Sequence, residues 1–179
     1  NPYFSGSILA GYSCMQERLR IQHGYQTRQF DIFQMRSYKT KQKIPHLNSS
    51  YQARWEAPLV GAKATCTVTD YLTLRGQYQY FFCVKYDGRG YWNLRQNQFN
   101  GSFHQSSNRS KGFGYLLSGG AALNILNNWN LTFDATYTKL HAKGGHDKSH
   151  RRSGSIIKVP FGKASLKSTM WRFGVEYLF

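Results

Sequence analysis

The sequence of 179 residues has few acidic residues, few cysteines and no long apolar run. Eight Asp and Glu residues stand against 24 Lys and Arg residues, which gives a formal net charge of +16. The three cysteines, Cys14, Cys66 and Cys83, have no metal-ligand spacing, and we interpret them as small apolar side chains. No stretch approaches 18 consecutive apolar residues, so a transmembrane helix is excluded.

The first residues also show no charged segment followed by an apolar segment, so no signal peptide is visible. The length fits a single domain over residues 1–179, which we expect to be mature or N-terminally incomplete. The positive charge first suggests a nucleic-acid partner. However, basic residues gather between the alternating segments described below, as in 36–43 and 143–152, which equally fits a basic rim facing lipopolysaccharide. We expect outer-membrane lipid rather than nucleic acid as the partner.

The last nine residues alternate between apolar and polar side chains. Because successive residues of a strand face opposite sides, this pattern predicts a strand with one aromatic face. A chain that ends on Phe after such a strand resembles bacterial outer-membrane barrels, in which a polar-x-Gly-x-x-aromatic-x-aromatic pattern is read by the barrel-assembly machinery. The residues that match this insertion signal are Arg172, Gly174, Tyr177 and Phe179.

Five further segments alternate in the same way and predict strands; they are 3–14, 51–70, 72–86, 113–125 and 129–137. Polar or basic stretches, which predict loops, separate some of them; these are 15–46, 87–111 and 139–163. The fold class is therefore all-β, an antiparallel transmembrane β-barrel of outer-membrane type with six visible strands. Known small barrels begin at about eight strands, because an open edge in lipid leaves hydrogen bonds unmade. We expect the six strands to be part of a larger barrel.

Four stretches resemble the omptins, ten-stranded outer-membrane endopeptidases of Gram-negative bacteria. These are 9–12, 51–61, 119–137 and the closing strand, in the order of omptin strands five to ten. The resemblance implies a ten-stranded barrel at the cell surface, no cofactor, and lipopolysaccharide as a possible bound lipid. It places Arg54, and more loosely Tyr12, at positions that contact lipid A phosphates in that family. Arg54 shares the outward parity of Val60, and its planar donors suit phosphate, although a solvated surface Arg is an alternative.

The resemblance also identifies a place for catalytic residues. Omptins hydrolyse peptide bonds with a water held between an Asp–His dyad and a facing Asp pair, and the dyad belongs where this chain reads Asp87-Gly88-Arg89. Asp87 is the candidate catalytic residue, expected to face inward beside Lys85, but Arg89 stands at the His position and cannot accept a proton. We expect His104 to lie too far along the chain to replace it, and the facing Asp pair to lie upstream.

The sequence therefore favours an omptin-like surface barrel with degenerate or lost endopeptidase activity. Two alternatives stay open: an active endopeptidase whose other catalytic residues lie in missing sequence, and a porin or structural barrel. The porin alternative depends on the charged residues expected on the inner face. In a narrow barrel they could fill the lumen, and in a wider barrel they could make a pore prefer anions. These residues are Lys63, Arg75, Lys85, Asp134, Arg172 and Glu176. The segment 146–150 contains two histidines and Asp147, but neighbouring cations predict a solvated loop rather than a metal site.

Overall fold

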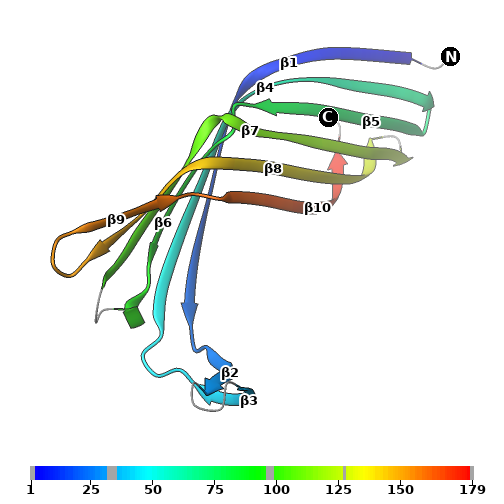
Figure 1. Cartoon of the computed structure of the whole chain (residues 1–179). Coiled ribbons are helices and arrows are strands. Elements are labelled where there is room, and N and C mark those ends of the chain that lie inside the picture. The colour runs from blue at the N-terminus through cyan, green and yellow to red at the C-terminus, as the bar shows by residue number, and fades with distance from the viewer. Residues whose placement is uncertain (1–2, 32–35, 96–98, 127, 178–179) are drawn as a thin grey trace.

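The computed structural model describes residues 3–31, 36–95, 99–126 and 128–177 and shows a long curved antiparallel sheet (Figure 1). The strand order of this sheet is β1 (Tyr3–Gln22), β4 (Asn48–Thr69), β5 (Leu72–Phe82), β7 (Phe99–Leu126), β8 (Trp129–Arg151) and β10 (Lys163–Tyr177). Off this path, β6 (Lys85–Tyr91) pairs with β4 and β7, and β9 (Ile156–Pro160) pairs with β8. A hairpin of β2 (Tyr25–Asp31) and β3 (Arg36–Lys43) and a short helix, η1 (Asn93–Arg95), complete the elements. The six predicted strands correspond to the six neighbours of the main path.

The sheet bends sharply and divides into two arms (Figure 1). The membrane arm contains β5 and β10, and the distal arm contains β6 and β9, while the longer strands run through both. Backbone irregularities mark the bend: Cys83 has a φ of 53°, and Gly144 and Gly145 have φ values of 69° and 102°. A Cβ atom at Gly145 would collide with the carbonyl oxygen of Ser106, so this position requires glycine.

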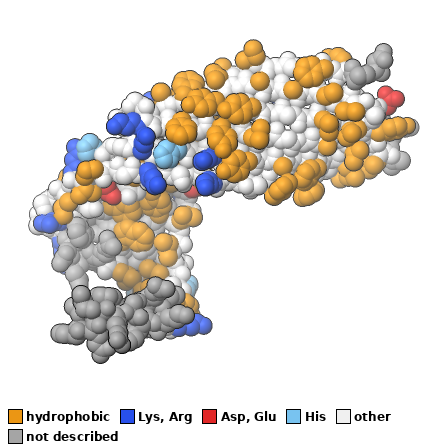
Figure 2. Space-filling model, turned by 45° about the vertical axis from the view of Figure 1, so that its right-hand side comes forward, with side chains coloured by type: hydrophobic (Ala, Val, Ile, Leu, Met, Phe, Trp, Pro, Cys, Tyr) orange, Lys and Arg blue, Asp and Glu red, His pale blue; other side chains and the backbone are white. Residues whose placement is uncertain are grey.

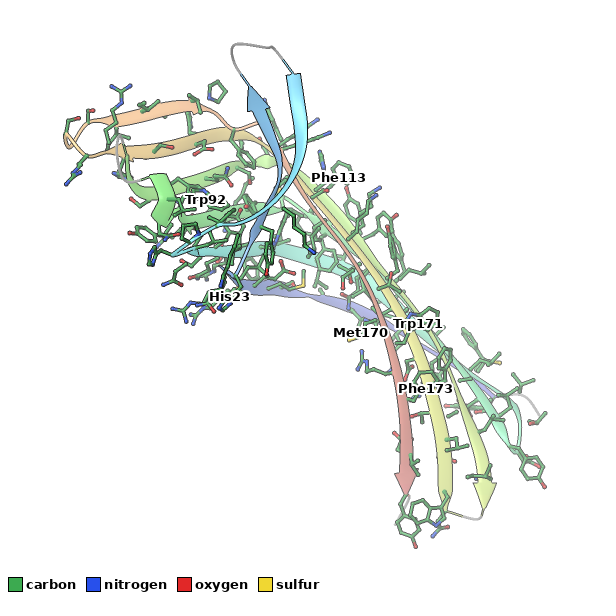
Figure 3. The ribbon with its side chains drawn as sticks, turned by 90° about the horizontal axis from the view of Figure 1, so that it is seen from below. His23, Trp92, Phe113, Met170, Trp171 and Phe173 are labelled. Carbon is green, nitrogen blue, oxygen red and sulfur yellow. The ribbon has the colours of Figure 1, made fainter. Side chains whose placement is uncertain are left out.

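The membrane arm has one exposed apolar face, called the outer face below. Residues that lie directly opposite each other in an antiparallel pair share a face, so the register joins Val60 to Tyr80 on it. Trp171 and Phe173 of β10 are neighbours on this face and are 60% and 80% exposed (Figure 3). A sheet of a water-soluble protein would bury two such aromatic side chains more deeply. Figure 2 shows apolar side chains spread over this arm, with Lys and Arg side chains gathered at the bend. The outer face is therefore suited to lipid.

The opposite, inner face is polar in the membrane arm and apolar at the bend. In the membrane arm, Arg75 reaches across Gly120 to Asp134, with 3.5 Å between the Arg75 Nη2 and Asp134 Oδ2 atoms. A Cβ atom at Gly120 would collide with the Asp134 carboxylate, so the missing side chain makes room for this ion pair. At the bend lies a small buried cluster of Ala53, Trp55, Ala57, Phe81, Val84, Tyr86, Leu140, Ala142 and Phe161. These residues are the buried apolar core of the described part of the chain.

Three predicted loops are largely strand. The stretch 87–111 holds most of β6 and the beginning of β7, 139–163 holds the end of β8 and all of β9, and 15–46 holds the end of β1 and the β2–β3 hairpin. The segment 146–150 is likewise paired on both sides, with β7 and with β9, and is not a loop. Both faces of the distal arm carry polar residues, so alternation of hydrophobicity could not reveal its strands.

The predicted single strand over 72–86 is also wrong, because it breaks at the bend. The two residues between β5 and β6 shift the alternation, so Lys85 lies opposite Glu56 and shares a face with Arg54. Lys85 and Asp87 are therefore on the outer face, not the inner face.

Among the described residues, β1 and β10 are the two edges of the main sheet. A sheet edge in lipid leaves backbone donors and acceptors unpaired. Closure by further strands into a ten-stranded barrel stays a prediction. Within the same described ranges, no helix is long and apolar enough to cross a membrane.

Candidate functional site

The outer face changes from apolar to basic where the membrane arm reaches the bend. Along β8 the outward Tyr137 is followed by Lys139 and Lys143, and these two lysines lie directly opposite Lys167 and Lys163 of β10. Like charges that face each other across a strand pair are unfavourable. Two such pairs beside an exposed apolar face favour an anionic layer that neutralises them.

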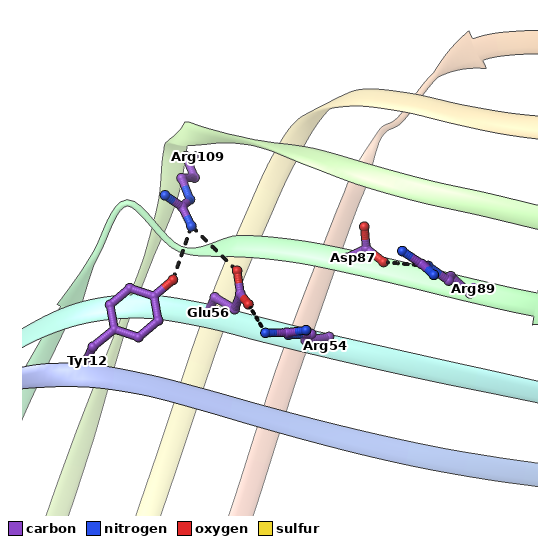
Figure 4. Close-up of polar contacts among 6 residues, drawn as sticks. All are labelled: Tyr12, Arg54, Glu56, Asp87, Arg89 and Arg109. Atoms are coloured by element: carbon purple, nitrogen blue, oxygen red, sulfur yellow. Dashed lines mark hydrogen bonds and ion pairs between the residues drawn. The ribbon is translucent and has the colours of Figure 1, made fainter.

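A tighter cluster lies across β1, β4 and β7 at the same transition (Figure 4). The Arg54 Nη2 atom forms an ion pair with Glu56 Oε1 at 2.5 Å, and Arg109 Nη2 lies 3.5 Å from Glu56 Oε2. Arg109 also donates a hydrogen bond to the Tyr12 hydroxyl at 3.1 Å. The Glu56 side chain is only 15% exposed, whereas those of Arg54 and Arg109 are 51% and 54% exposed. Glu56 thus holds two guanidinium groups that stay about half exposed. We call these four residues the outer-wall cluster.

The structure therefore brings together Tyr12 and Arg54, the two lipid-contacting candidates from the sequence. Their contact is indirect, through Arg109 and Glu56, which no sequence pattern indicated as lipid contacts. A depression on the outer face is lined by Arg54 and Glu56 of this cluster and by residues of β6. On β6, Lys85 and Arg89 add two positive charges and Asp87 adds one negative charge. With Arg109, four cations face two carboxylates, so the surface carries a surplus of positive charge.

Asp87 lies on this outer face and has two cationic or hydrogen-bonding partners. Its Oδ1 atom accepts a hydrogen bond from Arg89 Nε at 3.2 Å, and its Oδ2 atom lies 2.7 Å from His104 Nε2. The expectation that His104 is too distant is wrong, because β7 returns beside β6 and places His104 opposite Arg89. Burial alone would raise the pKa of Asp87, but His104 and Arg89 outweigh it and lower that pKa.

An Asp–His pair is one half of the omptin arrangement, yet its surroundings here differ from that arrangement. Arg89 binds the same carboxylate, and the other carboxylate in the depression, Glu56, is engaged by Arg54 and Arg109. Within the described residues, no facing pair of free carboxylates lies beside Asp87 and His104. The catalytic role of Asp87 stays a prediction. The described residues also contain no group of three or more metal-ligating side chains.

The residues of the insertion signal are on β10, except Phe179, which lies outside the described residues. Arg172 lies opposite Asp134 on the inner face, and Gly174 lies opposite Thr132. The Tyr177 ring packs against Trp129 with the centroids 4.9 Å apart and the planes tilted by 57°. Their recognition by the barrel-assembly machinery stays a prediction.

Comparisons with known proteins agree with this architecture. The model of a family described as "Pom: Protochlamydia outer membrane protein" matches residues 4–179. Among solved structures, the chain is similar to the outer membrane protease OmpT from Escherichia coli, with a TM-score of 0.74 and 12% sequence identity. This similarity covers 98% of the present chain and 58% of the OmpT chain. No curated protein sequence matches the chain.

These findings confirm the predicted all-β antiparallel fold of outer-membrane type and the outer-membrane location. At 12% identity the likeness to OmpT shows the fold alone, and the chain spans little more than half of that structure's length.

Proposed function

The chain belongs to the Protochlamydia outer membrane protein family, and from this premise we propose that it forms the wall of a cell-surface barrel without endopeptidase activity. The outer wall of this barrel holds the phosphorylated headgroups of outer-membrane lipid, lipopolysaccharide being the chemical type that fits best.

The outer-wall cluster is the observation that carries this proposal. A guanidinium group has five donors in a fixed fork that matches the oxygens of a phosphate. Glu56 occupies some donors of Arg54 and Arg109 and aligns the two groups beside each other. Their exposed donors and the Tyr12 hydroxyl lie next to the apolar face, where the acyl chains of the same lipid would pack.

A second feature of the outer face supports the same function. A groove of about 860 Å³ opens at the bend, and its lining includes Lys111, Lys143, Tyr80, Phe82 and Phe113. Lysines beside aromatic residues match the interface between acyl chains and charged headgroups.

The surroundings of Asp87 support the absence of peptidase activity. General acid–base catalysis needs a group that can take a proton from water at neutral pH. His104 and Arg89 lower the pKa of the Asp87 carboxyl group, so this carboxylate is a weak base at neutral pH. It also lies on the outer face of the sheet rather than on the inner face.

Lipid binding by refolded protein in detergent tests the proposal. We compare bisphosphorylated lipid A with its dephosphorylated form, using wild type, Arg54→Ala with Arg109→Ala, and Arg152→Ala as a control that removes one Arg from the distant β8–β9 turn. The double variant should bind bisphosphorylated lipid A about tenfold more weakly or worse, because charge-assisted hydrogen bonds are lost, and its binding should depend less on salt. Equal binding of the two lipids by wild type would contradict the proposal, as would a loss of the same size in Arg152→Ala.

A second candidate function is an anion-preferring pore. On the inner face of the membrane arm, Lys63, Arg75 and Arg172 surround the single carboxylate of Asp134 in one depression. Such a wall would attract anions if the closed barrel leaves an open lumen. Planar-bilayer recordings under a salt gradient test this function: an anion-directed reversal potential that moves toward zero in Lys63→Gln would support it, and the absence of conductance would exclude it.

A further inference from the structure

The inner face of the distal arm contains a cavity whose lining includes no residue of the outer-wall cluster. Its volume is about 460 Å³, within the range of small-molecule sites of roughly 300–1,000 Å³. The principal side chains that line it are Leu19, Ile21, Tyr51, Trp92, Phe103 and Asp147. They come from four strands and the segment after β6, and Figure 3 shows Trp92 in the distal arm, away from Trp171 of the membrane arm.

Three aromatic rings form one wall of this cavity. The Tyr51 and Phe103 rings stack with their centroids 5.9 Å apart and their planes at 18°, and Trp92 stacks on Phe103 at 5.7 Å and 10°. A Cβ atom at Gly90 would collide with the Phe103 ring, so the glycine allows that ring to lie flat against the strand. The three near-parallel rings form one aromatic wall of the cavity.

A carboxylate is fixed beside this wall by a hydrogen-bond chain. The Gln105 side chain donates to Asp147 Oδ2 at 2.9 Å, while its own oxygen accepts hydrogen bonds from the hydroxyls of Tyr51 at 3.2 Å and Tyr86 at 3.4 Å. Two tyrosine donors therefore orient the amide so that its NH₂ group faces Asp147. Burial, reinforced by the charge of Asp147, raises the pKa of Tyr51.

The Asp147 carboxylate is only partly satisfied. Its Oδ1 atom is buried and has no hydrogen-bond partner among the described residues, and none of the ion pairs in the described ranges includes Asp147. Leaving a buried charged oxygen unpaired is costly, and a bound cation would remove that cost.

We propose that this cavity binds a small organic cation that has a flat apolar body and an ammonium or guanidinium group. The cationic group faces Asp147, and the apolar body packs against the wall formed by Tyr51, Phe103 and Trp92. This site is separate from the outer-wall cluster, because it lies on the opposite face of the sheet and has the opposite charge.

Two probes of the same shape test the proposal by calorimetry on refolded protein: phenethylammonium, and the neutral 2-phenylethanol. Wild type should bind the ammonium at least about tenfold more tightly than the alcohol. Asp147→Asn should reduce the affinity for the ammonium to that for the alcohol and leave the alcohol unchanged. The control Asp70→Asn removes a carboxylate from the exposed β4–β5 turn and should change neither the affinity for the ammonium nor the affinity for the alcohol.

Phe103→Leu measures the contribution of the aromatic wall, because it should lower the affinity of the protein for both probes. Equal affinity of wild type for the two probes would overturn the proposal, and so would full ammonium binding by Asp147→Asn. The wild-type comparison decides the matter even if a variant does not refold.

Discussion

Asp87 Oδ2 on β6 lies 2.7 Å from His104 Nε2 on β7, although 17 positions separate the two residues in the chain. The register places Asp87 opposite Ser106 and Arg89 opposite His104. The His104 side chain therefore reaches diagonally from β7 to Asp87 on the adjacent strand β6. In an Asp-x-His motif both residues come from one strand, and here Arg89 takes the His position. The Asp87 carboxylate therefore contacts both His104 and Arg89.

The lowered pKa of Asp87 predicts a pH dependence of stability. Because the folded-state pKa lies below the ordinary value of 3.8, the carboxylate stabilises the fold fully above that value. This contribution disappears as the pH falls through the lower, folded-state pKa. We expect Asp87→Asn to unfold at lower urea concentration than wild type near pH 7, and the difference to shrink at about pH 3. A constant difference across this range, or the same behaviour in Asp70→Asn, would refute this assignment.

The same contact predicts the outcome of a peptidase assay. The described residues place no facing carboxylate pair beside Asp87, and Arg89 binds its carboxylate, so the chain should not cleave a fluorogenic dibasic peptide in detergent containing lipopolysaccharide. General acid–base help is typically worth about 10²–10⁴-fold, so its loss should leave no measurable turnover. Cleavage by wild type that disappears in both Asp87→Ala and His104→Ala would restore the endopeptidase.

The membrane arm could be predicted from the sequence because lipid imposes a strict pattern on it. Each outward position from Leu72 to Phe82 must be apolar or small, and this produced a visible alternation. The distal arm has no such requirement, so its strands looked like loops. The two-residue break at Cys83 then reversed the expected faces of Lys85 and Asp87, and no residue type there announces a positive φ.

The outer-wall cluster was only half predictable for a similar reason. Arg54 could be assigned because β4 runs without interruption from the apolar segment. Arg109 has the same parity as the outward Phe113, and extending that alternation backward would have suggested its face. Its contacts with Glu56 and Tyr12, however, follow from strand order, which single-strand patterns do not contain.

The assignment of the faces makes a prediction for the centre of β5. Tyr78 lies on the outer face and is 48% exposed, whereas its neighbour Gln79 points to the polar inner face. Tyr78→Arg should lower the free energy of unfolding in lipid by about 2–4 kcal/mol, because a cation would face acyl chains. Gln79→Arg is the matched control and should cost much less; the reverse order would mean that the two faces are exchanged.

The bend makes a separate prediction at Gly145. Its φ of 102° and its contact with Ser106 exclude a side chain, so Gly145→Ala should destabilise the fold by about 1–3 kcal/mol. Gly162→Ala is the control, because a Cβ atom there meets no atom within 4 Å. Chemical denaturation of both variants measures the difference, and equal stability would show that the bend does not depend on this backbone conformation.

The most direct test of the outer-wall account is the distance between Arg guanidinium nitrogens and lipid phosphorus. Solid-state ¹⁵N–³¹P dipolar dephasing can measure it in proteoliposomes containing bisphosphorylated lipid A. The account predicts nitrogen–phosphorus distances of about 4 Å for wild type, and loss of this dephasing in Arg54→Lys with Arg109→Lys. Absence of short-range dephasing in wild type, or dephasing that persists unchanged in the double variant, would contradict the account.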